Sequence, residues 1–252
     1  MLNFIDSHCH LDFSNNISHL IAQAQQVGVS RFVVPSVNYN NCSTVLALSQ
    51  QYSAVACAFG IHPHFIQSDN KLSSLTKLAT AQRNNIVAIG EIGLDGAIAT
   101  DLTIQIELLV KQLKLAKELD LPVICHAHKA YDPLLKQLRI IKLKRGGVIH
   151  GFSGSLVQAN EFIKLGFKLG IGGVITYPRA NKIRTTVSQL SLENIMLETD
   201  SPDMPLFQQQ GKPNAPVNIP IIAQTISELM EIDLAQVASQ TNCNTTTLFS
   251  LD

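Results

Sequence analysis

The chain has 252 residues, of which 46% are hydrophobic, and its 19 basic and 19 acidic residues balance at neutral pH. This length and hydrophobic content allow a large core, built as one barrel or as two small domains, and exclude a disordered chain. The balanced charge argues against an extended nucleic-acid-binding surface and leaves a local basic rim open.

Cellular context is predicted from the cysteines and from the apolar runs. The five cysteines form no Cys-x-x-Cys pair, so we expect free thiols in a reducing compartment. No apolar run approaches the ~20 residues that span a bilayer, and the N-terminus has no signal-peptide pattern. We therefore expect a cytoplasmic protein without a membrane partner. The oligomeric state stays open, a monomer being one option.

Eight strand-like apolar runs alternate with helical patterns along the chain. The runs are Phe4–His10, Arg31–Val37, Val55–His62, Ile86–Leu94, Pro122–His126, Gly147–Phe152, Lys168–Ile175 and Asn194–Asp200. The clearest helical stripe runs from Asp101 to Leu119. Gly28 and Gly166 stand where helices over Ile17–Val27 and Leu156–Leu165 would end.

Mostly continuous apolar strands are typical of a parallel sheet that is buried on both faces. The alternation, without an internal linker, predicts a single domain over residues 1–252 with a (β/α)8 TIM-barrel fold. A doubly wound open sheet is the alternative. From about Pro213 to Asp252 the pattern is helical, and this segment is expected to pack outside the barrel.

His8 and His10 stand two residues apart at the end of the first run. Side chains alternate along a strand, so both imidazoles should point to one face while Cys9 points to the other. Burying two unliganded imidazoles side by side is costly, which favours a shared metal ion over two unrelated core histidines.

Other polar residues fall at or near the C-terminal ends of later strands, where barrel enzymes keep their chemistry. With the first pair they make a coherent ligand set: His8, His10, Glu91, His126, His150 and Asp200. Four nitrogens and two carboxylates exceed the needs of one tetrahedral ion. They suit two divalent ions with Glu91 as the bridge, Zn²⁺ or Mn²⁺ being favoured and Mg²⁺ retained.

Two such ions could activate a water and clamp the oxygens of a phosphoryl transfer. Asp200 is then the candidate base for that water, and His62 and Lys129 are candidate substrate contacts. Structural alternatives stay open, because Asp200 could cap a turn, Glu91 could be exposed and His150 could be a core histidine. His64, after a proline, is interpreted as a loop residue.

Taken in order, these motifs resemble the TatD family of metal-dependent deoxyribonucleases, within the amidohydrolase superfamily. The matching segments are residues 4–10 (FIDSHCH), 60–64 (GIHPH), 90–95 (GEIGLD), 121–126 (LPVICH), 150–154 (HGFSG) and 198–202 (ETDSP). Residues 176–180 and 202–206 resemble the YjjV-type branch. The resemblance implies that the six residues hold divalent metals in a phosphodiesterase that trims DNA from an end. Single-stranded or frayed DNA ends are then the expected partner.

The sequence departs from the family at two places. After His126 the family usually has a small residue and then Arg, whereas this chain has His128 there and Lys129 next. The loop after Asp95 lacks the usual aromatic residue, and Ile104 stands about where an Arg is usual. The ligand set survives, but expected phosphate or base contacts are lost.

Three hypotheses follow. The first is a metal-dependent nuclease acting on DNA ends. The second is a metal hydrolase of another ester or amide on the same scaffold, such as a small phosphate ester or an aminoacyl-tRNA link. The third is a non-catalytic binding protein that keeps the barrel. The complete ligand set argues against this third hypothesis.

Overall fold

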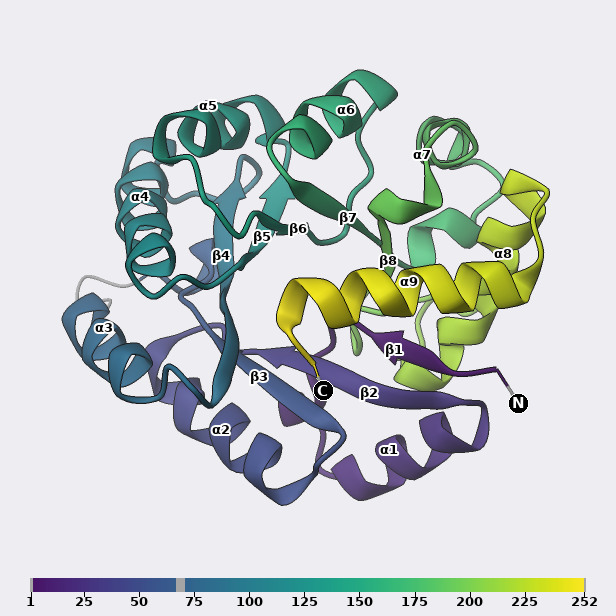
Figure 1. Cartoon of the computed structure of the whole chain (residues 1–252), viewed down its shortest axis with the longest axis horizontal. Helices are drawn as coiled ribbons and strands as arrows, with labels where there is room; N and C mark the ends of the chain where they lie inside the picture. The colour runs from purple at the N-terminus through teal and green to yellow at the C-terminus, as the bar shows by residue number, and fades with distance from the viewer. Residues whose placement is uncertain (1, 67–70, 252) are drawn as a thin grey trace.

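The computed structural model describes residues 2–66 and 71–251 and shows eight parallel strands, paired in chain order around a nearly closed barrel (Figure 1). The first and last strands meet where the backbone N–H of Ser7 donates to Leu197 O at 2.9 Å. The strands are β1 (Phe4–Asp6), β2 (Val29–Pro35), β3 (Val55–Phe59), β4 (Ile86–Asp95), β5 (Val123–His128), β6 (Gly147–Ile149), β7 (Phe167–Ile171) and β8 (Ile195–Leu197). The predicted (β/α)8 barrel is confirmed.

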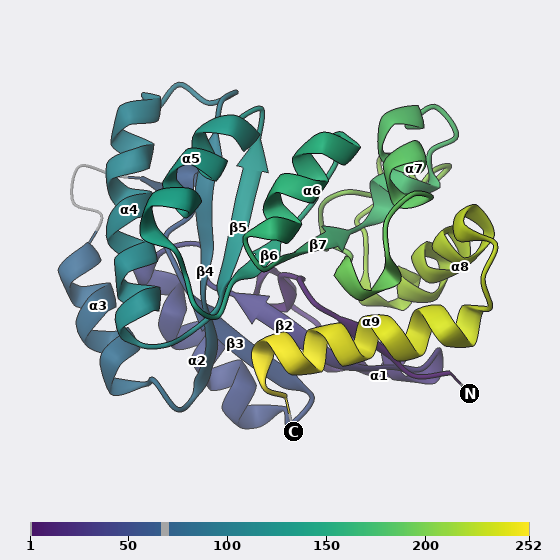
Figure 2. The ribbon, with the colours of Figure 1, turned by 45° about the horizontal axis from the view of Figure 1, so that its top comes forward.

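Helices surround the barrel and follow most of the strands (Figure 2). They are α1 (Ile17–Gln26), α2 (Cys42–Gln51), α3 (Leu72–Ala81), α4 (Leu102–Glu118), α5 (Tyr131–Ile141), α6 (Leu156–Lys164), α7 (Asn181–Val187), α8 (Ile219–Met230) and α9 (Leu234–Phe249). Short 3-10 helices lie in the connections, over Leu11–Phe13, Tyr39–Asn41, Pro63–Phe65, Gly173–Thr176, Leu192–Asn194 and Pro216–Asn218. Within the part of the chain that is described, every helix is too short or too polar to cross a bilayer.

Local sequence explains where the clearest helices begin and end. Asp101 caps α4 by accepting the backbone N–H of Thr103 at 2.7 Å, and Ser155 opens α6 in a reciprocal capping box with Gln158. Gly28 and Gly166 follow α1 and α6 with φ of 93° and 83°, a conformation that glycine adopts without strain. The predicted helix ends therefore agree with the structure to within a residue or two.

The C-terminal segment is helical as expected, but it does more than pack beside the barrel. Helix α9 crosses the end of the barrel at which the strands begin (Figure 1). Its last turn and the short segment that follows contribute Leu248, Phe249 and Leu251 to a cluster with inward-facing strand residues. The strand members of that cluster are Val33, Ala58, Ala88, Ile124, Val148 and Met196. The N-terminal end is thus closed by apolar side chains, which leaves the opposite end for chemistry.

Several expected strands are shorter than the apolar runs that predicted them. The run Phe4–His10 forms a strand only to Asp6, because the chain then turns toward its neighbours on both sides. Cys9 N donates to Val33 O at 3.1 Å, while His10 N donates to Ser201 O at 2.7 Å. The two histidines therefore leave from an irregular segment at the carboxyl end of β1, and Cys9 is buried in the helix-facing core as predicted.

Candidate metal centre

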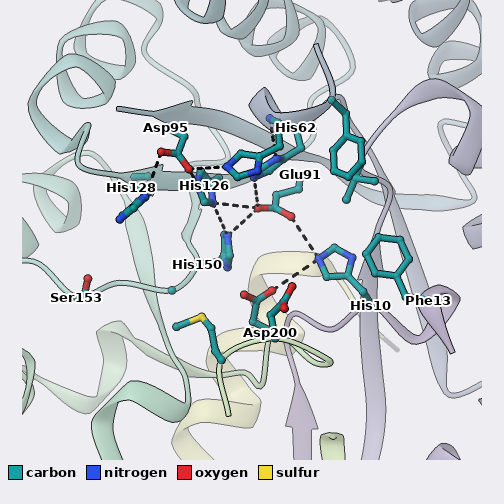
Figure 3. A pocket seen from close by; sticks show the side chains of 17 residues that line it. His10, Phe13, His62, Glu91, Asp95, His126, His128, His150, Ser153 and Asp200 are labelled. Atoms are coloured by element: carbon teal, nitrogen blue, oxygen red, sulfur yellow. Dashed lines mark hydrogen bonds and ion pairs between the residues drawn. The ribbon is translucent and has the colours of Figure 1, made fainter. Parts of the chain in front are cut away.

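A cavity of about 490 Å³ opens at the carboxyl ends of the strands and is lined by most of the predicted site residues (Figure 3). Glu91 in β4 and His126 in β5 enter it from strands, whereas His10, His150 and Asp200 enter from the segments just beyond strands. His8 is fully buried beneath them. The topology thus brings all six predicted ligands to one place.

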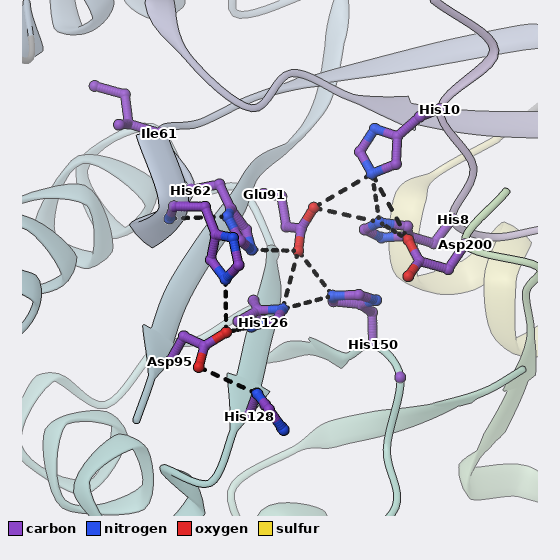
Figure 4. Close-up of polar contacts among 12 residues, drawn as sticks. His8, His10, Ile61, His62, Glu91, Asp95, His126, His128, His150 and Asp200 are labelled. Carbon is purple, nitrogen blue, oxygen red and sulfur yellow. Dashed lines mark hydrogen bonds and ion pairs between the residues drawn. The ribbon is translucent and has the colours of Figure 1, made fainter. Parts of the chain in front are cut away.

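One group of four ligand atoms includes the Oε2 atom of Glu91 (Figure 4). The Nε2 atoms of His8 and His10 are 3.3 Å apart and lie 3.4 and 3.5 Å from Oε2. Oδ1 of Asp200 completes the group at 3.4 Å from His8 and 3.7 Å from His10. Ligands at ~2.0–2.2 Å from a tetrahedral ion lie roughly 3.3–3.6 Å from one another. The spacing fits one divalent ion.

A second group surrounds the other carboxylate oxygen of Glu91. Oε1 lies 2.7 Å from Nε2 of His150, 3.2 Å from Nε2 of His62 and 3.5 Å from Nδ1 of His126. The nitrogens of His126 and His150 are themselves 3.3 Å apart. Each oxygen of Glu91 therefore faces its own set of imidazoles, the arrangement that a carboxylate bridging two ions requires.

The electrostatics of the site suit ligation. Burial lowers the pKa of His8 to about 3, so its imidazole is neutral and presents a lone pair. Burial raises the pKa of Glu91, but the surrounding histidines outweigh it and hold that pKa well below its usual range. The Nε2 atoms of His8 and His10 face each other at 3.3 Å, and two lone pairs at that distance need a cation or a proton between them. This buried set of nitrogen and oxygen donors thus fits a divalent metal ion.

Asp200 sits in the segment after β8 in a left-handed conformation, with φ of 55°. Its backbone N–H donates to His8 O at 2.9 Å, which ties it to the segment that follows β1. The carboxylate faces the imidazoles of His8 and His10, and burial raises its pKa to about 6. Its side chain is 15% exposed, so it contacts both the buried ligands and the open cavity.

The two residues predicted to contact the substrate, His62 and Lys129, line different cavities. His62 is 8% exposed and lies within the second ligand group, which makes it a candidate ligand as well as a wall of the cavity. Lys129 is exposed on the segment after β5 and lines a neighbouring cavity instead. The difference arises because the chain turns after β5, where Lys129 has φ of 50°.

Asp95, at the end of β4, was not in the predicted ligand set and yet organises the rim of the site. Its carboxylate contacts His64 at 2.8 Å and both His126 and His128 at 3.1 Å. Since His126 Nδ1 faces Glu91, the contact of its Nε2 with Asp95 orients the ring. Burial raises the Asp95 pKa, but hydrogen bonds from His64 and the Ala97 N–H lower it to a net value below the usual range. The sequence feature that points to Asp95 is its position at the end of an apolar run.

Glu198, between β8 and Asp200, is the second residue that the pattern did not single out. It is fully buried, accepts the backbone N–H of Gly151 at 2.5 Å, and lies 3.7 Å from Nδ1 of His150. It therefore supports His150 from the side opposite Glu91. Its only sequence signal is membership in the matched segment 198–202.

A parallel (β/α)8 barrel whose mouth gathers histidines around a buried glutamate has the donor set of a metal-dependent hydrolase. The model of the family described as TatD related DNase matches residues 5–250. The chain therefore belongs to the TatD family of metal-dependent hydrolases.

Similar proteins agree with this assignment. The chain is 42% identical, over 98% of each sequence, to a protein of Escherichia coli K12 named "Uncharacterized metal-dependent hydrolase YjjV". The crystal structure of YjjV, a TatD homologue, superposes with a TM-score of 0.95 over 99% of this chain and 98% of that one. A hydrolase of the TatD family from Entamoeba histolytica, 20% identical, shares the fold with a TM-score of 0.86 over 100% and 99% of the two chains.

Proposed function

We propose that this TatD-family hydrolase cleaves phosphodiester bonds at the ends of DNA strands, using two divalent ions. The observation that carries the proposal is Glu91, whose two oxygens face separate imidazole groups. Paired ions about 3.5–4 Å apart stabilise both the attacking and the leaving oxygen of a phosphoryl transfer. A carboxylate that binds one ion with each oxygen would hold two ions at this separation.

Each side chain has a role in this proposal. His8, His10 and Asp200 would hold one ion, His126 and His150 the other, and Glu91 both. The ions would lower the pKa of a water and neutralise phosphate charge. Asp200 would take the proton from the attacking water, since its carboxylate reaches the open cavity. Asp95 and Glu198 would keep the imidazoles of His126 and His150 oriented.

The wall of the cavity supports a nucleotide substrate. Phe13 is 50% exposed and Phe65 is 40% exposed, and both line the cavity. The ring of Phe13 stacks on His10 with centroids 5.0 Å apart, and Phe13 still keeps half of its surface exposed. Exposed aromatic rings beside a cavity are typical platforms for unpaired bases, and such bases occur at single-stranded or frayed ends.

A second candidate is the hydrolysis of another ester or amide, such as a small phosphate ester or an aminoacyl-tRNA link. Two departures from the family favour it. Ile104 is 51% exposed where an Arg is usual, and His128 replaces another Arg while bonding to Asp95. A site with fewer guanidinium groups holds a long phosphate backbone less tightly.

Activity screening of protein reconstituted with Zn²⁺, Mn²⁺ or Mg²⁺ tests both candidates. The substrates are 5′- and 3′-labelled single-stranded DNA, RNA, phosphomonoesters, acyl esters and aminoacyl-tRNA. We expect release of short products from DNA ends, with metal dependence. Hydrolysis confined to acyl esters or small phosphate esters would refute the DNA nuclease proposal and favour the second candidate.

A Glu91→Gln variant tests the bridge within the same screen. We expect it to lower the affinity for both ions, because the amide offers one neutral oxygen in place of two charged ones. Metal content is measured by elemental analysis after dialysis against a weak chelator. Glu107→Gln, on the exposed face of α4, is the matched control and should keep wild-type metal content. A Glu91→Gln protein with two ions and full activity would show that Glu91 is not the bridge.

A further inference from the structure

A second cavity of about 430 Å³ lies beside the cavity of the metal centre. The two share Ala127, His128 and Ser153 as lining residues, so they adjoin at the barrel mouth. The second cavity is further lined by Lys129, which precedes α5, and by Lys182, in the first turn of α7. We call it the lysine cavity.

The lysine cavity carries unbalanced positive charge. Lys129 and Lys182 are both exposed, and no salt bridge within residues 2–66 and 71–251 includes either of them. Asp132 is the carboxylate that lines the same cavity. Two ammonium groups against one carboxylate leave a net attraction for anions.

Neutral hydrogen-bonding groups complete the lining. The Tyr131 hydroxyl oxygen accepts the backbone N–H of Ser153 at 2.9 Å, so its own hydrogen is available to another acceptor. The Ser153 hydroxyl lies 3.4 Å from that of Tyr131. One of these two hydroxyls donates to the other, so one hydroxyl hydrogen and the two ammonium groups remain as donors for phosphate oxygens.

The lysine cavity lies on the side of the metal centre away from the aromatic wall. Figure 3 shows Phe13 and His10 on one side of Glu91, and His128 and Ser153 on the other. A nucleotide chain that stacks a base on the aromatic side and places a phosphate at the metals would extend its next phosphate toward the lysines. The family's Arg is absent at His128, and the lysines supply positive charge just beyond it.

We propose that the lysine cavity is a subsite for a second phosphate group of the substrate, adjacent to the phosphate at the metal centre. The inference rests on the proposed phosphodiesterase function and deepens it. It defines the preferred substrate as a nucleotide with two phosphates, one on each side of its sugar. Lys129 and Lys182 are binding residues in this account and take no part in bond cleavage.

The test is direct binding to the metal-loaded protein, measured by isothermal titration calorimetry. The probes are a deoxynucleoside 3′,5′-bisphosphate and the two corresponding monophosphates. Wild type should bind the bisphosphate about tenfold more tightly than the better monophosphate, as charge-assisted contacts at a partly exposed site provide. The double variant Lys129→Gln/Lys182→Gln should reduce this preference to about unity, while Lys114→Gln, on the exposed face of α4, keeps it.

The binding test separates the subsite from the proposed reaction. If DNA is not hydrolysed but the bisphosphate preference depends on the two lysines, the subsite stands and the phosphodiesterase proposal fails. If DNA is hydrolysed but the bisphosphate binds no better than a monophosphate, or the double variant keeps the preference, the subsite is refuted. Circular dichroism of each variant confirms that its fold is intact.

Discussion

Replacing Gly170 with alanine should disturb the metal centre from beneath His150. A Cβ atom at this position of β7 would lie 2.0 Å from Oε2 of Glu198 and 3.1 Å from Cα of His150. Glu198 is fully buried, so its carboxylate must shift within the packed interior to relieve this clash. The same carboxylate accepts the Gly151 N–H at 2.5 Å, and a shift would lose this contact.

The expected cost combines two effects. Overpacking of a buried site costs about 1–3 kcal/mol, and loss of a charge-assisted hydrogen bond costs about 1.5–3 kcal/mol. We expect the free energy of unfolding to fall by roughly 3–5 kcal/mol, which lowers Tm by roughly 6–20 °C for a chain of this size. If His150 binds metal as proposed, loss of its support should weaken metal affinity by about 10–100-fold.

Gly172→Ala is the matched control, two residues further along and beside the same glutamate. Its Cβ atom would meet Glu198 O at 3.5 Å and Cγ at 3.6 Å, which are ordinary contacts, and φ is −114°. This variant should gain about 0.4–1 kcal/mol, because alanine restricts the unfolded chain. Calorimetric melts and competition with a chromophoric chelator measure both variants. Equal Tm values and equal metal affinities for the two would refute the reasoning.

Three further predictions concern catalysis, the closed end of the barrel and the thiols. Asp200→Asn should lower kcat by ~10²–10⁴-fold with KM little changed, since the amide keeps the shape but cannot accept a proton near neutral pH; near-wild-type kcat with metals bound would exclude Asp200 as the base. Phe249→Ala should lower the free energy of unfolding in urea by about 3–5 kcal/mol, and a loss below about 1 kcal/mol would show that the ring does not close the barrel. One thiol, the exposed Cys243, should react rapidly with an aromatic disulfide in the native protein and all five after unfolding. Burial raises the pKa of Cys42 to about 11, and a second fast thiol would contradict this burial pattern.

Much of the site follows from one property of parallel barrels. The carboxyl ends of all strands meet at one face, so polar residues that end apolar runs must converge, whatever their separation in sequence. That rule is sufficient to bring His8, Glu91 and Asp200 together and to place a buried carboxylate among histidines. It does not require the first histidines to lie in a regular strand, and in the structure they follow β1 instead.

The tertiary structure alone decided which side chains support the ligands. Asp95 meets His128 across 33 residues, and Glu198 meets Gly151 across 47, and no local pattern encodes either contact. It also decided that Lys129 joins Lys182 in a separate cavity, because that depends on how a turn and a distant helix pack together. Strand periodicity determines which end of the barrel a residue reaches, whereas side-chain direction and packing determine what it touches there.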